Sequence, residues 1–181
     1  VAVVVGIENY QNADVPKADF AINDAQAVAR VLKQTFGYSD DRIFLKTDGQ
    51  ASAGGLKSLI REELKDLVKE GRSEVFVYYS GHGAPNVDEK EGYIIPWDYN
   101  PQRSPSRNSA YAINDLYKDL EDLHAKNVTV VLEACFTGNL GGGKTLIKNA
   151  RPIGIEIEKP VQVLANSLVI AAGSYIATSY Q

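Results

Sequence analysis

The stretch that decides the fold is VFVYYSGHG, residues 75–83. It is apolar from Val75 to Tyr79 and then becomes polar and glycine-containing. A short apolar run rich in β-branched and aromatic residues is typical of a strand that is buried on both faces. Four other segments are expected to be strands. They are residues 2–7, 42–46, 128–132 and 168–172.

Helices are expected between these strands. Apolar residues recur at helical spacing over residues 21–36, 56–67 and 113–123, and Gly37 and Gly71 are placed to end the first two helices. Strands that alternate with helices predict a parallel sheet covered on both faces. We therefore expect a three-layer α/β/α sandwich with a mostly parallel sheet of five to six strands. Two segments are predicted to be loops: residues 87–107, with a small hairpin around Tyr93–Pro96, and residues 138–162.

The composition limits the possible partners. The chain has 181 residues, which suits a single domain, and its net charge of −4 argues against a nucleic-acid or anionic-membrane surface as a partner. No segment has the roughly 18–20 apolar residues of a membrane span. One cysteine excludes an internal disulfide and fits a reducing, cytoplasmic location. Because the chain has no methionine, we interpret residues 1–181 as one domain cut from a longer protein, with a sixth strand beyond Gln181.

Two short motifs follow the third and fourth predicted strands. Ser80-Gly81-His82-Gly83 follows one, and residues 133–138, with the sequence EACFTG, follow the other. In an open parallel sheet, ligands bind beyond the carboxyl ends of the strands. If these two strands are neighbours, His82 and Cys135, which are 53 residues apart, project into one cleft.

This pair of residue types has a specific chemistry. A free thiol has a pKa of about 8.5 and is a weak nucleophile until a base removes its proton. His82 is the candidate base, and the backbone N–H groups of Gly83 and Cys135 are candidates for an oxyanion hole. Taken singly, Cys135 could instead be a small buried apolar residue and His82 a residue that only bonds to backbone.

With these motifs in place, the chain resembles the caspase-like cysteine peptidases. YSGHG and EACFTG resemble the His and Cys motifs of that family, and GIENY, AINDA and GYIIPWD resemble its connecting segments. The resemblance covers nearly the whole chain. It is stronger to metacaspases, paracaspases and bacterial caspase homologues than to animal caspases. It implies endopeptidase activity on protein or peptide substrates, with regulatory domains outside this segment.

The resemblance also implies a substrate preference. In metacaspases, acidic residues at the positions of Asp24 and Glu133 bind a basic P1 side chain, and Ser80 aligns with the same pocket. Two carboxylates attract Arg or Lys and repel Asp. Glu133 is one methylene longer than the Asp that is more usual there, so the pocket differs in shape. The alternative is that Asp24 only occupies a helix start and Glu133 is solvated.

No metal or other cofactor is expected. Metacaspases often need Ca²⁺, and Asp98 and Asp115 could contribute ligands. However, Asn114 replaces one expected acid, and a later acidic position falls in the glycines of residues 141–143. Oxygen ligation of Ca²⁺ needs more carboxylates than this. Two histidines and one cysteine make a structural zinc site improbable.

Two other functions remain open from the sequence. A chain with this fold could be an inactive interaction module, although an intact His–Cys pair argues against it. Residues 138–145 match the phosphate-binding pattern G-x-x-x-x-G-K-[ST], but Pro152 stops a following helix within two turns.

The long loop from Gly138 to Gln162 is expected to be a site of self-cleavage. It carries Lys144 and Lys148, which the proposed acidic pocket would accept. Arg151 is a poorer site because Pro152 follows it. The alternative is that these lysines only keep a surface loop soluble.

Overall fold

The main sheet has five parallel strands. A computed structural model of the chain describes residues 1–86, 88–134, 136, 146 and 166–172. The strands are β1 (Ala2–Gly6), β2 (Ile43–Thr47), β3 (Glu74–Ser80), β7 (Asn127–Glu133) and β8 (Ser167–Ala172). Their order is β2-β1-β3-β7-β8, and every neighbouring pair is parallel. The predicted parallel sheet is confirmed.

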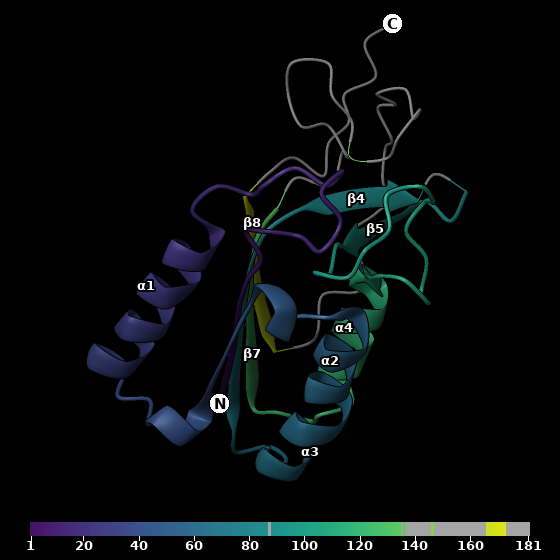
Figure 1. Ribbon diagram of the computed structural model, residues 1–181. Coiled ribbons are helices and arrows are strands. Elements are labelled where there is room, and N and C mark those ends of the chain that lie inside the picture. The colour runs from purple at the N-terminus through teal and green to yellow at the C-terminus, as the bar shows by residue number, and fades with distance from the viewer. Residues whose placement is uncertain (87, 135, 137–145, 147–165, 173–181) are drawn as a thin grey trace, which may run out of the picture.

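Helices cover both faces of this sheet, as Figure 1 shows. Helix α1 (Ala21–Gln34) lies on one face. On the other face, α2 (Ala53–Ser58) continues through a π-helical turn (Leu59–Glu63) into α3 (Leu64–Leu67), and α4 (Ile113–Glu121) packs beside them. The predicted three-layer arrangement is therefore confirmed.

Burial on both faces explains why the strands are apolar along their whole length. In β1, Val3 and Val5 belong to the large cluster beneath α2, α3 and α4, whereas Ala2 and Val4 belong to the smaller cluster beneath α1. Successive side chains of a strand point to opposite faces. The side chains on both faces of β1 are therefore buried, so both sets must be apolar.

Helix α1 packs closely on β1 because the last residue of that strand is a glycine. A Cβ atom on Gly6 would lie 2.4 Å from the carbonyl oxygen of Ala21 and 2.7 Å from Cβ of Ala25. The missing side chain therefore lets the first turn of α1 reach the carboxyl edge of the sheet. Asp24 is carried in that turn.

A small antiparallel sheet extends from the carboxyl edge. Its strands are β4 (Gly83–Asn86), β5 (Glu91–Ile94) and β6 (Tyr111–Ala112), in the order β4-β5-β6. The prediction of a hairpin around Tyr93–Pro96 was wrong in position, because Tyr93 lies within the second strand and pairs with Ala84. The first strand, β4, was not predicted because it contains Gly83 and Pro85, and glycine and proline are uncommon in strands. Pro85 is tolerated because β4 is an edge strand.

Among the described residues, we find no helix with the length and apolar character that crossing a bilayer requires.

Candidate active site

The two motifs begin at paired positions of the sheet. Strands β3 and β7 are neighbours, and their last residues, Ser80 and Glu133, lie opposite each other in the register. The backbone N–H of Gly81 donates to the carbonyl oxygen of Glu133 at 3.3 Å. The condition set in the sequence analysis, that these two strands are neighbours, is met. Cys135 itself lies outside the described residues. Its neighbours Ala134 and Phe136 are both buried.

The imidazole of His82 is held by the segment that follows β1. Its Nε2 atom lies 2.8 Å from the carbonyl oxygen of Pro16, and its ring stacks on Tyr10 with a centroid distance of 5.2 Å and an interplanar angle of 20°. A carbonyl oxygen can only accept, so Nε2 must carry the hydrogen. In the neutral ring, Nδ1 is then the unprotonated nitrogen.

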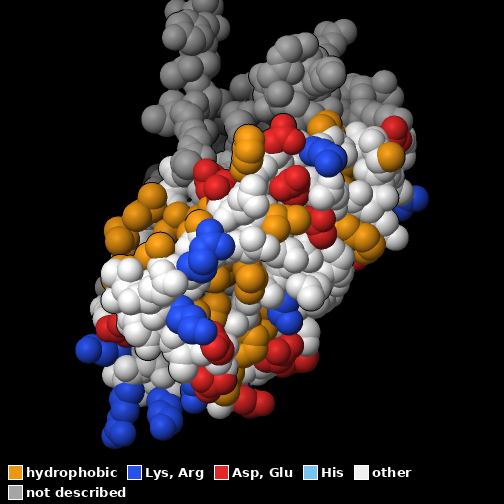
Figure 2. Space-filling view, turned by 60° about the vertical axis from the view of Figure 1, so that its left-hand side comes forward, with side chains coloured by type: hydrophobic (Ala, Val, Ile, Leu, Met, Phe, Trp, Pro, Cys, Tyr) orange, Lys and Arg blue, Asp and Glu red, His pale blue; other side chains and the backbone are white. Residues whose placement is uncertain are grey.

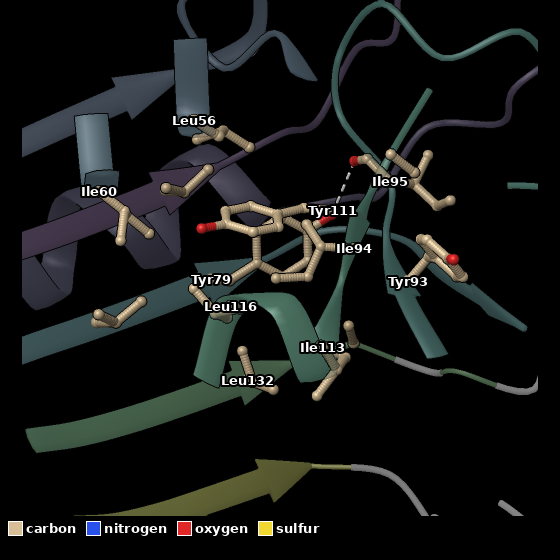
Figure 3. Packing of buried hydrophobic residues seen from close by; sticks show 14 of the residues in the cluster. Leu56, Ile60, Tyr79, Tyr93, Ile94, Ile95, Tyr111, Ile113, Leu116 and Leu132 are labelled. Carbon is tan, nitrogen blue, oxygen red and sulfur yellow. Dashed lines mark hydrogen bonds between the residues drawn. The ribbon is translucent and has the colours of Figure 1, made fainter. Parts of the chain in front are cut away.

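Two buried tyrosines hold the backbone of the same residue. The N–H of His82 donates to Oη of Tyr10 at 2.8 Å. Oη of Tyr79 lies 2.7 Å from the carbonyl oxygen of His82 and 3.0 Å from that of Ile95, the second contact being the dashed line in Figure 3. The two phenols also bond to each other. Burial raises the pKa of both tyrosines, so both remain protonated.

The environment of His82 favours its neutral form. Burial lowers the pKa of His82 below its ordinary value of 6.5, and the bond to the Pro16 carbonyl opposes this shift. Desolvation disfavours a charged imidazole, because water solvates the cation better than a protein interior does. A neutral histidine with one free nitrogen is suited to accept a proton.

The two glycines that flank His82, Gly81 and Gly83, lie in different structural settings. A Cβ atom on Gly81, whose φ is +157°, would lie 2.7 Å from Oη of Tyr79 and 3.1 Å from Oη of Tyr10. No side chain fits there while the tyrosine network is intact. Gly83 is buried, begins β4 and pairs with Ile94. Its role as an oxyanion donor stays a prediction.

A polar cluster lies beside these motifs on the α1 face of the sheet. The hydroxyl of Tyr78 donates to Oε2 of Glu133 and bonds to the hydroxyl of Ser80. Asp24, partly buried in the first turn of α1, is close enough to help raise the pKa of Tyr78. In Figure 2, acidic side chains lie near the top of the view, toward the carboxyl edge, and also near its bottom, interspersed with Lys and Arg. The structure thus brings Ser80 and Glu133 together around the hydroxyl of Tyr78, and Asp24 acts on that hydroxyl only through its charge.

The residues considered for Ca²⁺ bond to other parts of the protein. Asp98 accepts from the backbone N–H of Ala53 at 2.8 Å, and Asp115 pairs with Arg107 at 3.1 Å. Within the part of the chain that the structure describes, we find no group of three or more His, Cys, Asp or Glu side chains that could hold a metal ion. The phosphate-binding pattern at residues 138–145 lies outside the described residues.

Sequence reasoning missed three contributors to this site. Tyr10 and Pro16 follow β1 at the same sheet edge as the two motifs, so their position alone was a signal. Tyr78 lies two residues before Ser80 on β3, and the alternation of a strand places both on one face. That alternation could have identified Tyr78 as a neighbour of Ser80, one of the predicted pocket residues.

Comparison with known proteins identifies the family to which this chain is similar. A family model described as a caspase domain matches residues 1–179. Metacaspase-1A of Aspergillus niger is 26% identical over 154 residues, covering 76% of this chain and 35% of that protein. Metacaspase-1 of Meyerozyma guilliermondii is 27% identical over 157 residues, covering 76% and 35%. The chain thus spans about a third of the length of these relatives.

The solved structures show the same fold. A crystal structure of caspase-1 from Spodoptera frugiperda superposes with a TM-score of 0.62, covering 97% of this chain and 60% of that chain. The sequence identity is 15%, so this likeness carries the fold and not the activity.

Proposed function

Because this chain belongs to the caspase-domain family of peptidases, we propose that it is a cysteine endopeptidase in which His82 is the general base for Cys135 and which cleaves after Arg or Lys. The observation that carries the proposal is the pairing of Ser80 with Glu133. It puts His82 and Cys135 each two residues beyond paired strand ends. Its substrates are proteins or peptides.

The orientation of His82 supports its role as the base. With Nε2–H bonded to Pro16, Nδ1 is left to accept the thiol proton of Cys135. The thiolate attacks the scissile carbonyl carbon, and the negative charge moves to the carbonyl oxygen. His82 then returns its proton to the leaving amine, and water hydrolyses the resulting thioester. The N–H groups of Gly83 and Cys135 are the proposed donors to the oxyanion.

The acidic cluster supports the preference for a basic P1 residue. Asp24 and Glu133 supply two carboxylates next to the cleft, and the hydroxyls of Ser80 and Tyr78 add polar contacts. Hydrogen bonds between a carboxylate and a guanidinium or ammonium are roughly twice as strong as neutral ones. An Asp side chain at P1 would be repelled.

The test is a peptide library with mass-spectrometric mapping of the cleaved bonds. We expect cleavage after Arg and Lys and almost none after Asp. Asp24→Asn keeps the size of the side chain and removes its charge, so it should lower kcat/KM for basic peptides about tenfold or more, as expected for a hydrogen bond to a charged group. A profile dominated by P1 Asp would overturn the specificity. A peptide chloromethyl ketone ending in Arg should label Cys135 in a working enzyme and fail to label an inactive interaction module.

A further inference from the structure

Tyr78 is the one member of the acidic cluster whose hydroxyl contacts two of the other members directly. It lies on the α1 face of β3 and is only 5% exposed. Its hydroxyl donates to Oε2 of Glu133 and bonds to the hydroxyl of Ser80. Ser80 is likewise 5% exposed. A polar network therefore runs from the buried face of the sheet to the exposed carboxylate at its edge.

Glu133 needs such a partner if its carboxylate is to be oriented. It is the last residue of β7, and its side chain is exposed. An exposed glutamate is free to adopt many rotamers, and ordering it opposes binding by up to about 1.5–2 kcal/mol. The ring of Tyr78 is packed with Val4, Ala25 and Val131, so its hydroxyl is a fixed point.

From this geometry we propose that Tyr78 is a positioning residue for substrate specificity: its hydroxyl fixes the Glu133 carboxylate so that the cleft binds a P1 guanidinium in preference to a P1 ammonium. This inference rests on the proposed preference for basic P1 residues. The inference adds to that preference by naming which basic side chain is favoured and which residue sets the choice.

The preference for Arg follows from the shapes of the two cations. A guanidinium is planar and donates in a fixed fork, so it gains most from a carboxylate held in one orientation. An ammonium is a compact charge whose donors rotate, so it tolerates a mobile carboxylate. Fixing Glu133 therefore benefits Arg more than Lys. Burial and the nearby carboxylate raise the pKa of Tyr78, so its hydroxyl stays a donor throughout the neutral range.

The test compares Tyr78→Phe with the wild type on matched peptides that differ only in P1 Arg or Lys. We expect kcat/KM to fall about tenfold for Arg, mainly through KM, and threefold or less for Lys. In a Glu133→Gln background, adding Tyr78→Phe should change neither value further. Tyr38→Phe is the matched control, because Tyr38 packs on the same face near Glu74, at the other end of β3.

A second readout separates positioning from a general structural role. The chain has one cysteine, so the rate of its alkylation by iodoacetamide reports the reactivity of Cys135 without using the pocket. That rate should be unchanged in Tyr78→Phe. Equal losses for Arg and Lys, or a parallel loss of alkylation, would overturn the proposal, as would an unchanged Arg-to-Lys ratio. If the wild type prefers another P1 class altogether, the proposed function fails with it; if it cleaves after Arg and Tyr78→Phe behaves as wild type, only the role of Tyr78 fails.

Discussion

Nε2 of His82 lies 2.8 Å from the carbonyl oxygen of Pro16, a residue 66 positions earlier in the chain. This contact decides which nitrogen of the ring is available, because a carbonyl oxygen accepts and Nε2 must therefore donate. The proposed base is then Nδ1, whose orientation depends on the segment between β1 and α1. The catalytic proposal can be tested at each part of this arrangement.

Removing either member of the proposed pair should abolish peptidase activity. Cys135→Ala removes the nucleophile and His82→Ala the base, and each should lower kcat by on the order of 10⁴-fold. Peptide hydrolysis and thermal unfolding should be measured together, since His82→Ala also loses the stacking on Tyr10. A folded variant that retains most of its activity would exclude that residue from the chemistry.

Tyr10→Phe should slow catalysis with little change in substrate binding. The substitution keeps the ring that stacks on His82 but removes the oxygen that accepts from the His82 N–H. A partly buried N–H that loses its partner costs about 1–3 kcal/mol, so the loop should shift to satisfy it. We expect kcat to fall about tenfold with KM nearly constant. Tyr99→Phe is the control, because its hydroxyl bonds to the carbonyl of Arg103 in a different loop. A Tyr10→Phe enzyme with wild-type kcat would show that the stacking alone suffices.

Much of this arrangement could be predicted from the sequence, and the reason is burial. Strands such as residues 75–79 are covered on both faces, so their apolar runs and the helices between them were sufficient to predict the parallel sheet. The matching positions of the two motifs suggested one cleft only if their strands were neighbours, and the structure shows that they are. Asp24 and Glu133 came from the resemblance; Glu133 accepts a hydrogen bond from Tyr78, and the role of both residues in binding P1 stays a prediction.

What could not be predicted depends on contacts between distant residues. The path of the loop after β1 is fixed by Asp48, whose carboxylate accepts from the N–H groups of Glu8 and Asn9 at 2.8 and 3.0 Å. No periodicity in the sequence links these positions. The contact of Pro16 with His82 follows from that path, so it was equally hidden.

Gly81→Ala should impair activity more than stability. The new Cβ atom would lie 2.7 Å from Oη of Tyr79, so the His82 loop or the tyrosine must move. Because Gly81 lies in a loop at the sheet edge, we expect unfolding to be affected by no more than about 1–3 kcal/mol. Activity should fall at least tenfold, measured as kcat/KM on a P1 Arg peptide. Gly54→Ala is the control, since its Cβ atom would meet nothing within 4 Å. Full activity in Gly81→Ala would mean that the tyrosine network does not have to be rigid.

The acidic limb of the pH profile should lie below pH 6.5. His82 accepts a proton only when neutral, and burial lowers its pKa, so the neutral form persists to lower pH than in an exposed histidine. The profile of kcat/KM reports ionisations of the free enzyme. Asp24→Asn should show the same limb at lower activity, which separates His82 from the pocket carboxylates. By linkage, the contribution of neutral His82 to stability is full above pH 6.5 and declines as the pH falls toward its lowered pKa. An acidic limb at or above pH 6.5 would contradict the assignment.

The loop from Gly138 to Gln162 should be cut by the enzyme itself at Lys144 or Lys148. This loop lies outside the described residues except for Leu146, which lies between the two lysines in the sequence. Leu146 is 1% exposed and belongs to the large core cluster. A bond so close to a buried side chain must leave the core before it can enter a cleft in extended form. Burying a leucine contributes about 1.5–3 kcal/mol, so it should make self-cleavage slow.

Leu146→Ala should therefore speed the cut, and this variant distinguishes a core-anchored loop from a free one. Wild type, Leu146→Ala and Cys135→Ala proteins are incubated separately, and new N-termini are mapped by mass spectrometry. We expect cleavage after Lys144 or Lys148 in the first two proteins, about tenfold or more faster in Leu146→Ala, and none in Cys135→Ala. Equal cutting of the Cys135→Ala protein would indicate a contaminating protease. A fully active enzyme whose loop stays intact would show that the lysines only face solvent.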